Sequence, residues 1–502
     1  MRFKPWMITS GKAVIMDDQQ GAALGEPKKL GVVALIGLVV SACIGAGIFN
    51  LPGQLAEVSA AGPMIWSWVI CLVGVVALVL TLNNLLRKRP DLDAGIFSYG
   101  KAGCGWLGGF ISGWGYWLSS WIGNVAFATL LMAIVGSFWP VFGDGSNWPS
   151  VIVAAIVLWC LTFIVMAGMK GATLINTIGT ICKLIPIVIA MIVLVSTVKA
   201  GVFTQDFWGN LAANVSHGVA PSGVWTQMQG SIVNIMFVFV GIEGAAVLSK
   251  RAKSNKAAGN ATLWGLLILA IVYVWCSILP YAVFPQGVIS NWANNGTDGT
   301  VLSAVMSNTV GAWAYWILTI GIIISILACW LSWTILPAET TALMSNSEMT
   351  LAPFWGKPGK KRKDSYVTSL LIATILQTIF ILCLPFLSAA YTFASQMCTV
   401  AVLITYMFAG IYQMVISVQR KEAWQFIVGV ICTAFEVFAV FVAGWQDLLL
   451  LCIGITIGFF FYVPAAKKNG HRVGPWEWIV MALVCCAGII SIILACVGII
   501  SV

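Results

Sequence analysis

Long apolar runs separated by short polar segments make up almost all of the chain after residue 30. A helix needs roughly 20 apolar residues to cross the hydrocarbon core of a bilayer, and most runs reach about that length. The runs are continuous, unlike the short alternating segments of a membrane β-barrel. We therefore predict an all-α polytopic membrane protein with about 13 transmembrane helices, at 31–57, 63–86, 105–138, 150–168, 173–197, 225–248, 260–284, 311–345, 366–384, 388–417, 424–442, 447–465 and 476–500.

The charged residues agree with this prediction. Hydrophobic residues make up 60% of the 502 positions and charged residues only 9%, which excludes an ordinary soluble domain and a disordered chain. The net charge of +9 would suit nucleic acid, but 24 of the 26 Lys and Arg residues fall on one side if the N-terminus is cytoplasmic. Cytoplasmic loops carry such an excess. We expect a multi-pass protein of the cell (inner or plasma) membrane, an outside C-terminus if there are 13 spans, and no nucleic-acid partner.

Residues 1–30 read as a cytoplasmic tail without a cleavable signal, and the sequence leaves open whether Met1 or Met16 is the start. The 14 cysteines lie mostly inside apolar runs and show no metal-binding spacing, so neither a disulfide framework nor a metal site is predicted. No nucleophile and base occur at one depth, so we predict a protein that is not an enzyme and needs no cofactor. A channel would show a repeated polar stripe.

Two spans contain residues that interrupt a helix. In the first, Gly45 and Gly47 precede Asn50 and Pro52, and in the sixth, glycines flank Glu243. Glycine costs about 1 kcal/mol and proline about 3 kcal/mol inside a helix, and unwound backbone in a membrane is tolerated where it lines a cavity. Two alternatives stay open, namely close helix packing through small residues and a permanently protonated glutamate.

The two interruptions lie five spans apart, and an odd offset gives the two helices opposite orientations. That is the arrangement of an inverted repeat with binding at its interface. Spans three and eight agree, because both are long and rich in tryptophan. We predict a first five-helix repeat over 31–197, a second and inverted repeat over 225–417, and accessory C-terminal helices over 424–502.

Several motifs resemble those of the amino acid–polyamine–organocation (APC) superfamily, in particular its basic amino acid/polyamine antiporters and, within them, bacterial arginine–ornithine antiporters. The likeness covers about residues 30–345 well and the last spans loosely. The motifs are IGAGIF at 44–49, PDLDAGI at 90–96, GYWLSSWIGN at 115–124, KLIP at 183–186, GIEGA at 241–245, RAK at 251–253, LSW at 331–333 and AE at 338–339. Each is weak alone, but together and in this order they are specific.

The resemblance implies exchange of a cationic amino acid (arginine or lysine) for a related amino acid or amine such as ornithine, by alternating access. The alternatives are exchange of an amino acid for its decarboxylation product, such as histidine for histamine, and a non-exchanging permease or transporter-like sensor. The implied partners are amino acid substrates and membrane lipid, and some relatives are homodimers. The candidate substrate-binding residues are Ile44, Gly45, Ala46, Gly47, Tyr116, Asn124, Phe237, Gly241, Trp333 and Glu339.

Two charged residues inside spans are candidates for coupling, Glu243 and Lys183. Glu243 matches an acidic residue of the family that implies either proton sensing or coupling to movement of the sixth helix, and Lys183 resembles a stand-in for the sodium ion of other branches. We expect Lys183 to brace the first helix against the eighth; the alternative is that it snorkels toward the cytoplasmic face. Phe237 stands where relatives often have tryptophan, which weakens the expected cation–π contact. Glu57 and Glu436 are further carboxylates within spans.

Overall fold

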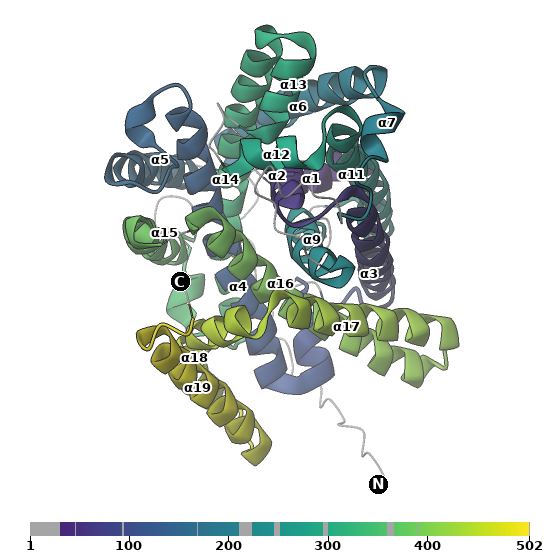
Figure 1. The fold of residues 1–502 in the computed structure, drawn as a ribbon. Helices are drawn as coiled ribbons and strands as arrows, with labels where there is room; N and C mark the ends of the chain where they lie inside the picture. The colour runs from purple at the N-terminus through teal and green to yellow at the C-terminus, as the bar shows by residue number, and fades with distance from the viewer. Residues whose placement is uncertain are drawn as a thin grey trace.

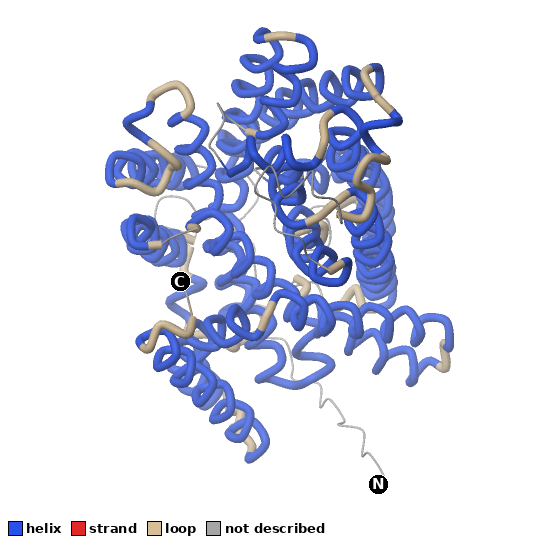
Figure 2. The backbone as a smooth tube through the Cα atoms, viewed as in Figure 1, coloured by secondary structure: helices blue, strands red, loops and turns tan. Residues whose placement is uncertain are grey.

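The computed structural model describes residues 31–45, 47–92, 95–167, 169–209, 223–244, 252–294, 300–358, 366–387 and 389–500. Within these ranges the chain is a bundle of α-helices joined by short turns, and no β-strand occurs in them (Figures 1 and 2). The predicted all-α class is therefore confirmed. The longer helices follow the apolar runs because a helix satisfies its own backbone hydrogen bonds where no water is present.

The first half of the bundle contains a broken helix followed by four long ones. These are α1 (Val32–Cys43), α2 (Gly47–Val58), α3 (Ala61–Lys88), α4 (Phe97–Gly136), α5 (Trp148–Ala167) and α6 (Met169–Ser196). The third span was expected to start at residue 105. α4 instead starts at Phe97 and contains a backbone kink at Gly105, whose φ is 76°.

The second half begins with a helix that ends at a break. It comprises α9 (Val224–Val238), α11 (Asn255–Val283), α14 (Ala312–Asn346), α15 (Val367–Cys383) and α16 (Ala390–Arg420). Three further helices follow, α17 (Ala423–Ala443), α18 (Trp445–Lys468) and α19 (Pro475–Cys496). The polar interruptions contain the short helices α7 (Ala200–Phe203), α12 (Gln286–Asn294) and α13 (Val301–Val310).

Ten helices of the described residues are long and apolar enough to cross a membrane, or 11 if the bent pair α1–α2 is one span. The predicted number of 13 is therefore not confirmed. The other two expected spans, 173–197 and 225–248, coincide in position with α6 and α9. Among these spans α4 is the most deeply buried, with 83% of an apolar 18-residue stretch inside the bundle. α19 is the least buried, with 17%. Accordingly, α4 crosses the middle of the bundle and α19 lies at its edge (Figure 1).

The helix contacts of the two halves mirror each other. α4 packs along α16 as α14 packs along α6, α1 packs on α11 as α9 packs on α3, and α5 meets α14 as α15 meets α4. The helices correspond in order along the two halves, α1 to α9, α3 to α11, α4 to α14, α5 to α15 and α6 to α16. Exchanging each helix for its counterpart therefore leaves these pairings unchanged. This is the pattern that two structural repeats produce. The boundaries of the repeats stay a prediction.

One end of the bundle, here called the charged end, carries several contacts between segments that the charge pattern places in the cytoplasm. Lys88 at the end of α3 pairs with Glu422 after α16. The Lys101 ammonium, near the start of α4, donates a 2.6 Å hydrogen bond to the carbonyl of Glu348 and lies 3.4 Å from its carboxylate. Asn469, after α18, donates to the carbonyl of Met349.

At the opposite end, segments expected outside meet one another. Tyr281 at the end of α11 donates a 2.9 Å hydrogen bond to the carbonyl of Ser59, and Gln286 of α12 donates one of 3.0 Å to the carbonyl of Ala56. The two predicted sets of loops thus lie at opposite ends of the bundle. The side of the membrane that each faces stays a prediction.

Candidate functional site

The two interruptions predicted from sequence meet in the structure. α1 ends at Cys43 and α2 begins at Gly47 with a bend of 41°. A Cβ at Gly45 would lie 2.8 Å from the Cys329 sulfur on α14, so any larger residue would have to displace that side chain. Ala46, a predicted binding residue, lies outside the described residues.

The second interruption follows α9. The chain leaves the helix after Val238, and Gly241 has a φ of 107°, a conformation that favours glycine. A Cβ there would lie 3.1 Å from the carbonyl oxygen of Ala42, at the end of α1. The two breaks therefore touch through backbone, which explains the glycine at this point.

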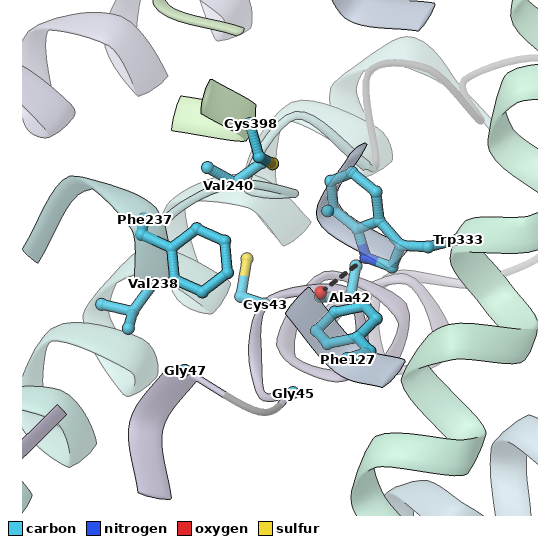
Figure 3. A pocket seen from close by; sticks show the side chains of 11 residues that line it. Ala42, Cys43, Gly45, Gly47, Phe127, Phe237, Val238, Val240, Trp333 and Cys398 are labelled. Carbon is cyan, nitrogen blue, oxygen red and sulfur yellow. Dashed lines mark hydrogen bonds between the residues drawn. The ribbon is translucent and has the colours of Figure 1, made fainter. Parts of the chain in front are cut away.

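A small cavity lies beside both breaks (Figure 3). The rings of Phe237 and Trp333 lie on opposite sides of it, with the Cys43 thiol between them. The Trp333 indole N–H donates a 3.2 Å hydrogen bond to the carbonyl of Ala42. The full lining is Ala42, Cys43, Gly45, Gly47, Gly123, Phe127, Phe237, Val238, Val240, Trp333 and Cys398. The cavity volume of about 20 Å³ is room for a water molecule or so, so a bound amino acid requires the lining to move.

Lys183 of α6 lies behind the break of the first helix. It is fully buried, and its ammonium donates two hydrogen bonds of 2.7 Å, to the carbonyls of Ser41 and Ile44. These carbonyls belong to the last turn of α1 and to the residue after it, where a helix leaves acceptors without partners. The Lys183 ammonium also interacts electrostatically with the thiol of Cys329 on α14. The ammonium group points to the helix break, and it does not snorkel to the bundle surface.

Glu243 lies at the end of the second break and is fully buried. Its carboxylate accepts a 2.7 Å hydrogen bond from the Tyr116 hydroxyl of α4, a hydrogen bond from the Tyr406 hydroxyl of α16, and a 3.2 Å hydrogen bond from the Gly241 amide. Three donors from three segments therefore surround one carboxylate. This group connects the second break to the two helices α4 and α16.

Asn124 lies one layer behind the cavity. Its amide donates to the carbonyl of Trp333 at 3.2 Å and to the Gln377 side chain at 3.3 Å. It therefore supports the helix that carries the Trp333 ring. Glu339 lies farther along α14, is partly buried, and acts electrostatically on Tyr116. Of the predicted binding residues, Gly45, Gly47, Phe237 and Trp333 line the cavity, whereas Ile44, Tyr116, Asn124, Gly241 and Glu339 do not in this conformation. Contact of any of them with substrate stays a prediction.

Sequence reasoning missed several residues of this region. Cys43, Phe127 and Cys398 line the cavity, and Tyr406 contacts Glu243. Cysteine, phenylalanine and tyrosine are ordinary residues in apolar helices, so nothing in their own sequence context marks them. Among the described residues no group of three or more His, Cys, Asp or Glu side chains is arranged to hold a metal ion.

Comparison with known proteins gives a consistent result. The amino acid permease family model matches residues 30–492. The arginine/ornithine antiporter of Latilactobacillus sakei is 40% identical over 477 residues, which cover 94% of this chain and 98% of that protein. The arginine/ornithine antiporter ArcD1 of Lactococcus lactis is 38% identical, with 93% and 89% covered. An arginine/agmatine antiporter of Chlamydia felis is 32% identical, with 88% and 91% covered.

Proposed function

Because this chain belongs to the amino acid permease family, we propose that it is a secondary transporter that exchanges arginine for ornithine across the membrane. The observation that carries the proposal is the similarity, along nearly the whole chain, to relatives named arginine/ornithine antiporters. The meeting of two broken helices at a cavity supports it, because transporters built from inverted repeats bind substrate at such a place. The cytoplasmic N-terminus and the repeats over 31–197 and 225–417 are parts of the same proposal.

In this proposal the substrate's carboxylate binds at the start of α2, next to Gly45 and Gly47. A helix N-terminus carries a partial positive charge and unpaired N–H groups, which suit an anion. The cationic side chain extends past Phe237 and Trp333, whose ring faces attract a cation. We assign Glu339 of α14 as the carboxylate that meets that cation once the cavity widens.

Glu243 and Lys183 act as positioning residues in this scheme. Glu243 holds the second break to α4 and α16, so movement of α9 is transmitted to those helices. Lys183 supplies a fixed positive charge at the first break. Since this charge is part of the chain, exchange requires no sodium ion.

A second candidate, exchange of arginine for agmatine, is favoured by the relatives from Chlamydia. The membrane potential separates the two. Arginine and ornithine each carry one positive charge at neutral pH, so their exchange moves no net charge. Agmatine carries two, so its exchange for arginine moves one elementary charge, worth about 2.3 kcal/mol per 100 mV. That is a shift of about 50-fold in the exchange equilibrium.

The experiment is counterflow in liposomes that contain the purified protein. We expect labelled arginine to enter only when arginine or ornithine is loaded inside, with rates unaffected by an imposed potential or by sodium. Entry without internal substrate would show a non-exchanging permease. A response of agmatine exchange to potential, with no ornithine exchange, would establish the second candidate. Histidine and histamine are added to the same counterflow assay to compete with labelled arginine.

A further inference from the structure

A second buried glutamate lies in α17, outside the substrate cavity. Glu436 is fully buried, and neither of its carboxyl oxygens has a hydrogen-bond partner. It lies seven residues before the end of α17 at Ala443, which is roughly 10 Å of helix at about 1.5 Å per residue. Glu436 therefore lies within the hydrocarbon core of a bilayer about 30 Å thick.

The helices around Glu436 are closely packed. α17 packs on α3, α9 and α16. A Cβ at Gly74 of α3 would overlap the ring of Phe435, and a Cβ at Gly410 of α16 would lie 2.5 Å from the Thr433 hydroxyl. Both contacts lie within one turn of Glu436. The helices on two sides of this carboxyl thus approach as near as glycine allows, and no part of the Glu436 side chain reaches the surface in this conformation.

Among the described residues, two thiols interact electrostatically with Glu436. They are those of Cys71 on α3 and of Cys432, one turn earlier on α17. The Cys71 thiol also faces the carbonyl of Ile232 on α9, at 3.9 Å. Neither thiol offers a positive charge. Among the described residues, no Lys, Arg or His forms an ion pair with Glu436.

The other helices that touch α17 do not change this environment. α9 has no ionisable side chain between Val224 and Val238. On α16, the Tyr406 hydroxyl donates to Glu243, and the Tyr412 hydroxyl accepts from Arg89. On α18 the first ionisable side chain is Asp447, in its first turn and beyond the end of α17.

We propose that Glu436 is a proton-binding site separate from the substrate cavity. A carboxylate without partners is far more costly to bury than a neutral carboxylic acid, so Glu436 holds a proton while α17 is closed on α3 and α9. When the interface opens and water enters, the acid ionises and its O–H proton passes to water. When the interface closes, the carboxylate takes a proton back.

Opening of this interface is expected because α17 packs on α9, the helix with the second break. Trp225 of α9 and Phe438 of α17 have ring centroids 6.2 Å apart. If α9 moves during exchange, α17 must slide or separate. This part of the inference rests on the proposed function, and it makes the exchange rate depend on pH through Glu436.

Infrared spectroscopy of the purified protein tests the protonation directly, without transport. We expect Glu436→Gln to remove one carboxylic-acid C=O band from the neutral-pH spectrum. The control Glu422→Gln changes a carboxylate already paired with Lys88, and we expect it to remove intensity from the carboxylate region. Loss of carboxylate intensity in Glu436→Gln would show that Glu436 is ionised and would overturn the proposal.

Liposome exchange tests the coupling. Glu436→Gln copies the protonated form, so we expect its exchange rate to vary less than twofold between mildly acid and mildly alkaline pH, while the wild type varies several-fold. An unchanged pH profile in an active Glu436→Gln protein would overturn the coupling. Absence of exchange by the wild type would refute the proposed function and leave the infrared result standing.

If Glu436→Gln does not fold, Glu436→Met should fold, since a neutral acid without partners contributes no hydrogen bond. Failure of both variants to fold would overturn the proposal.

Discussion

Replacing Lys183 with methionine keeps an unbranched apolar side chain about as long as the lysine stem and removes the ammonium group at the first helix break. In the wild type this group donates two hydrogen bonds of 2.7 Å, to the carbonyls of Ser41 and Ile44. We expect the variant to fold and to exchange substrate at least tenfold more slowly. The reason is that the unwound backbone loses the donors that hold its shape.

The magnitude follows from the two carbonyls. The Ile44 carbonyl loses this donor, and the Ser41 carbonyl keeps a weak contact with the Cys329 thiol. A buried acceptor left without a donor costs about 1–3 kcal/mol, so the change costs at least that amount. Burying an ammonium ion also costs several kcal/mol, and methionine avoids that cost. The two effects partly cancel in the free energy of unfolding, whereas the unwound backbone at the break still loses its donors. A local bias of about 2 kcal/mol alone lowers the population of the broken-helix geometry about thirtyfold.

The assay is counterflow of labelled arginine at equal amounts of protein, with and without sodium. Lys199→Met is the matched control, because Lys199 is exposed after α6 and its side chain has no role in the site. We expect wild-type rates for Lys199→Met. If Lys183→Met exchanges within twofold of the wild type and with the same ion dependence, the role given to Lys183 is refuted.

Three further variants test the other parts of the site. Gly241→Ala places a Cβ 3.1 Å from the Ala42 carbonyl at a φ of 107°, so we expect the exchange rate to fall at least tenfold. The control Gly37→Ala should keep the wild-type rate, because a Cβ there meets nothing within 4 Å. Equal initial rates for the two variants would contradict this prediction. Phe237→Leu removes a cation–π contact of about 0.5–1 kcal/mol, so the KM for arginine should rise two- to fivefold, and an unchanged KM would place the cation elsewhere. Glu243→Gln should lower the maximal rate and leave the KM unchanged, since this carboxylate does not line the cavity; a raised KM with a normal maximal rate would argue for direct substrate contact.

Much of the fold was predictable because membrane spans and helix breaks are local properties of the sequence. Apolar runs set the helix positions, Gly45 and Gly241 mark backbone that departs from a helix, and Gly47 marks the point where the helix resumes. Lys183 was recognisable because a lysine inside an apolar run is expensive. Its partner carbonyls were not predictable, because they depend on how α6 packs against α1.

The unpredicted parts depend on contacts between distant segments. Tyr406 lies 163 residues from Glu243 in sequence and reaches it because α16 packs on α9, the helix that precedes the second break. Gln377 meets Asn124 in the same way, across 253 residues. The helices α12 and α13 lie in a polar interruption at 285–310, where the hydropathy pattern predicts no span and gives no reason to expect ordered helices.

The contacts at the charged end have a consequence for control by ionic strength. The Lys88–Glu422 pair is partly exposed, with side-chain exposures of 23% and 31%, and Lys101–Glu348 has 25% and 10%. Exposed pairs contribute roughly 0.2–1 kcal/mol each, and this contribution falls as salt is added, because the screening length shortens from about 10 Å at 0.1 M to about 3 Å at 1 M. Together they can bias an opening equilibrium by about two- to thirtyfold. We therefore expect a higher electrolyte concentration on this side to weaken both pairs and to favour opening of the charged end, whichever substrate is bound.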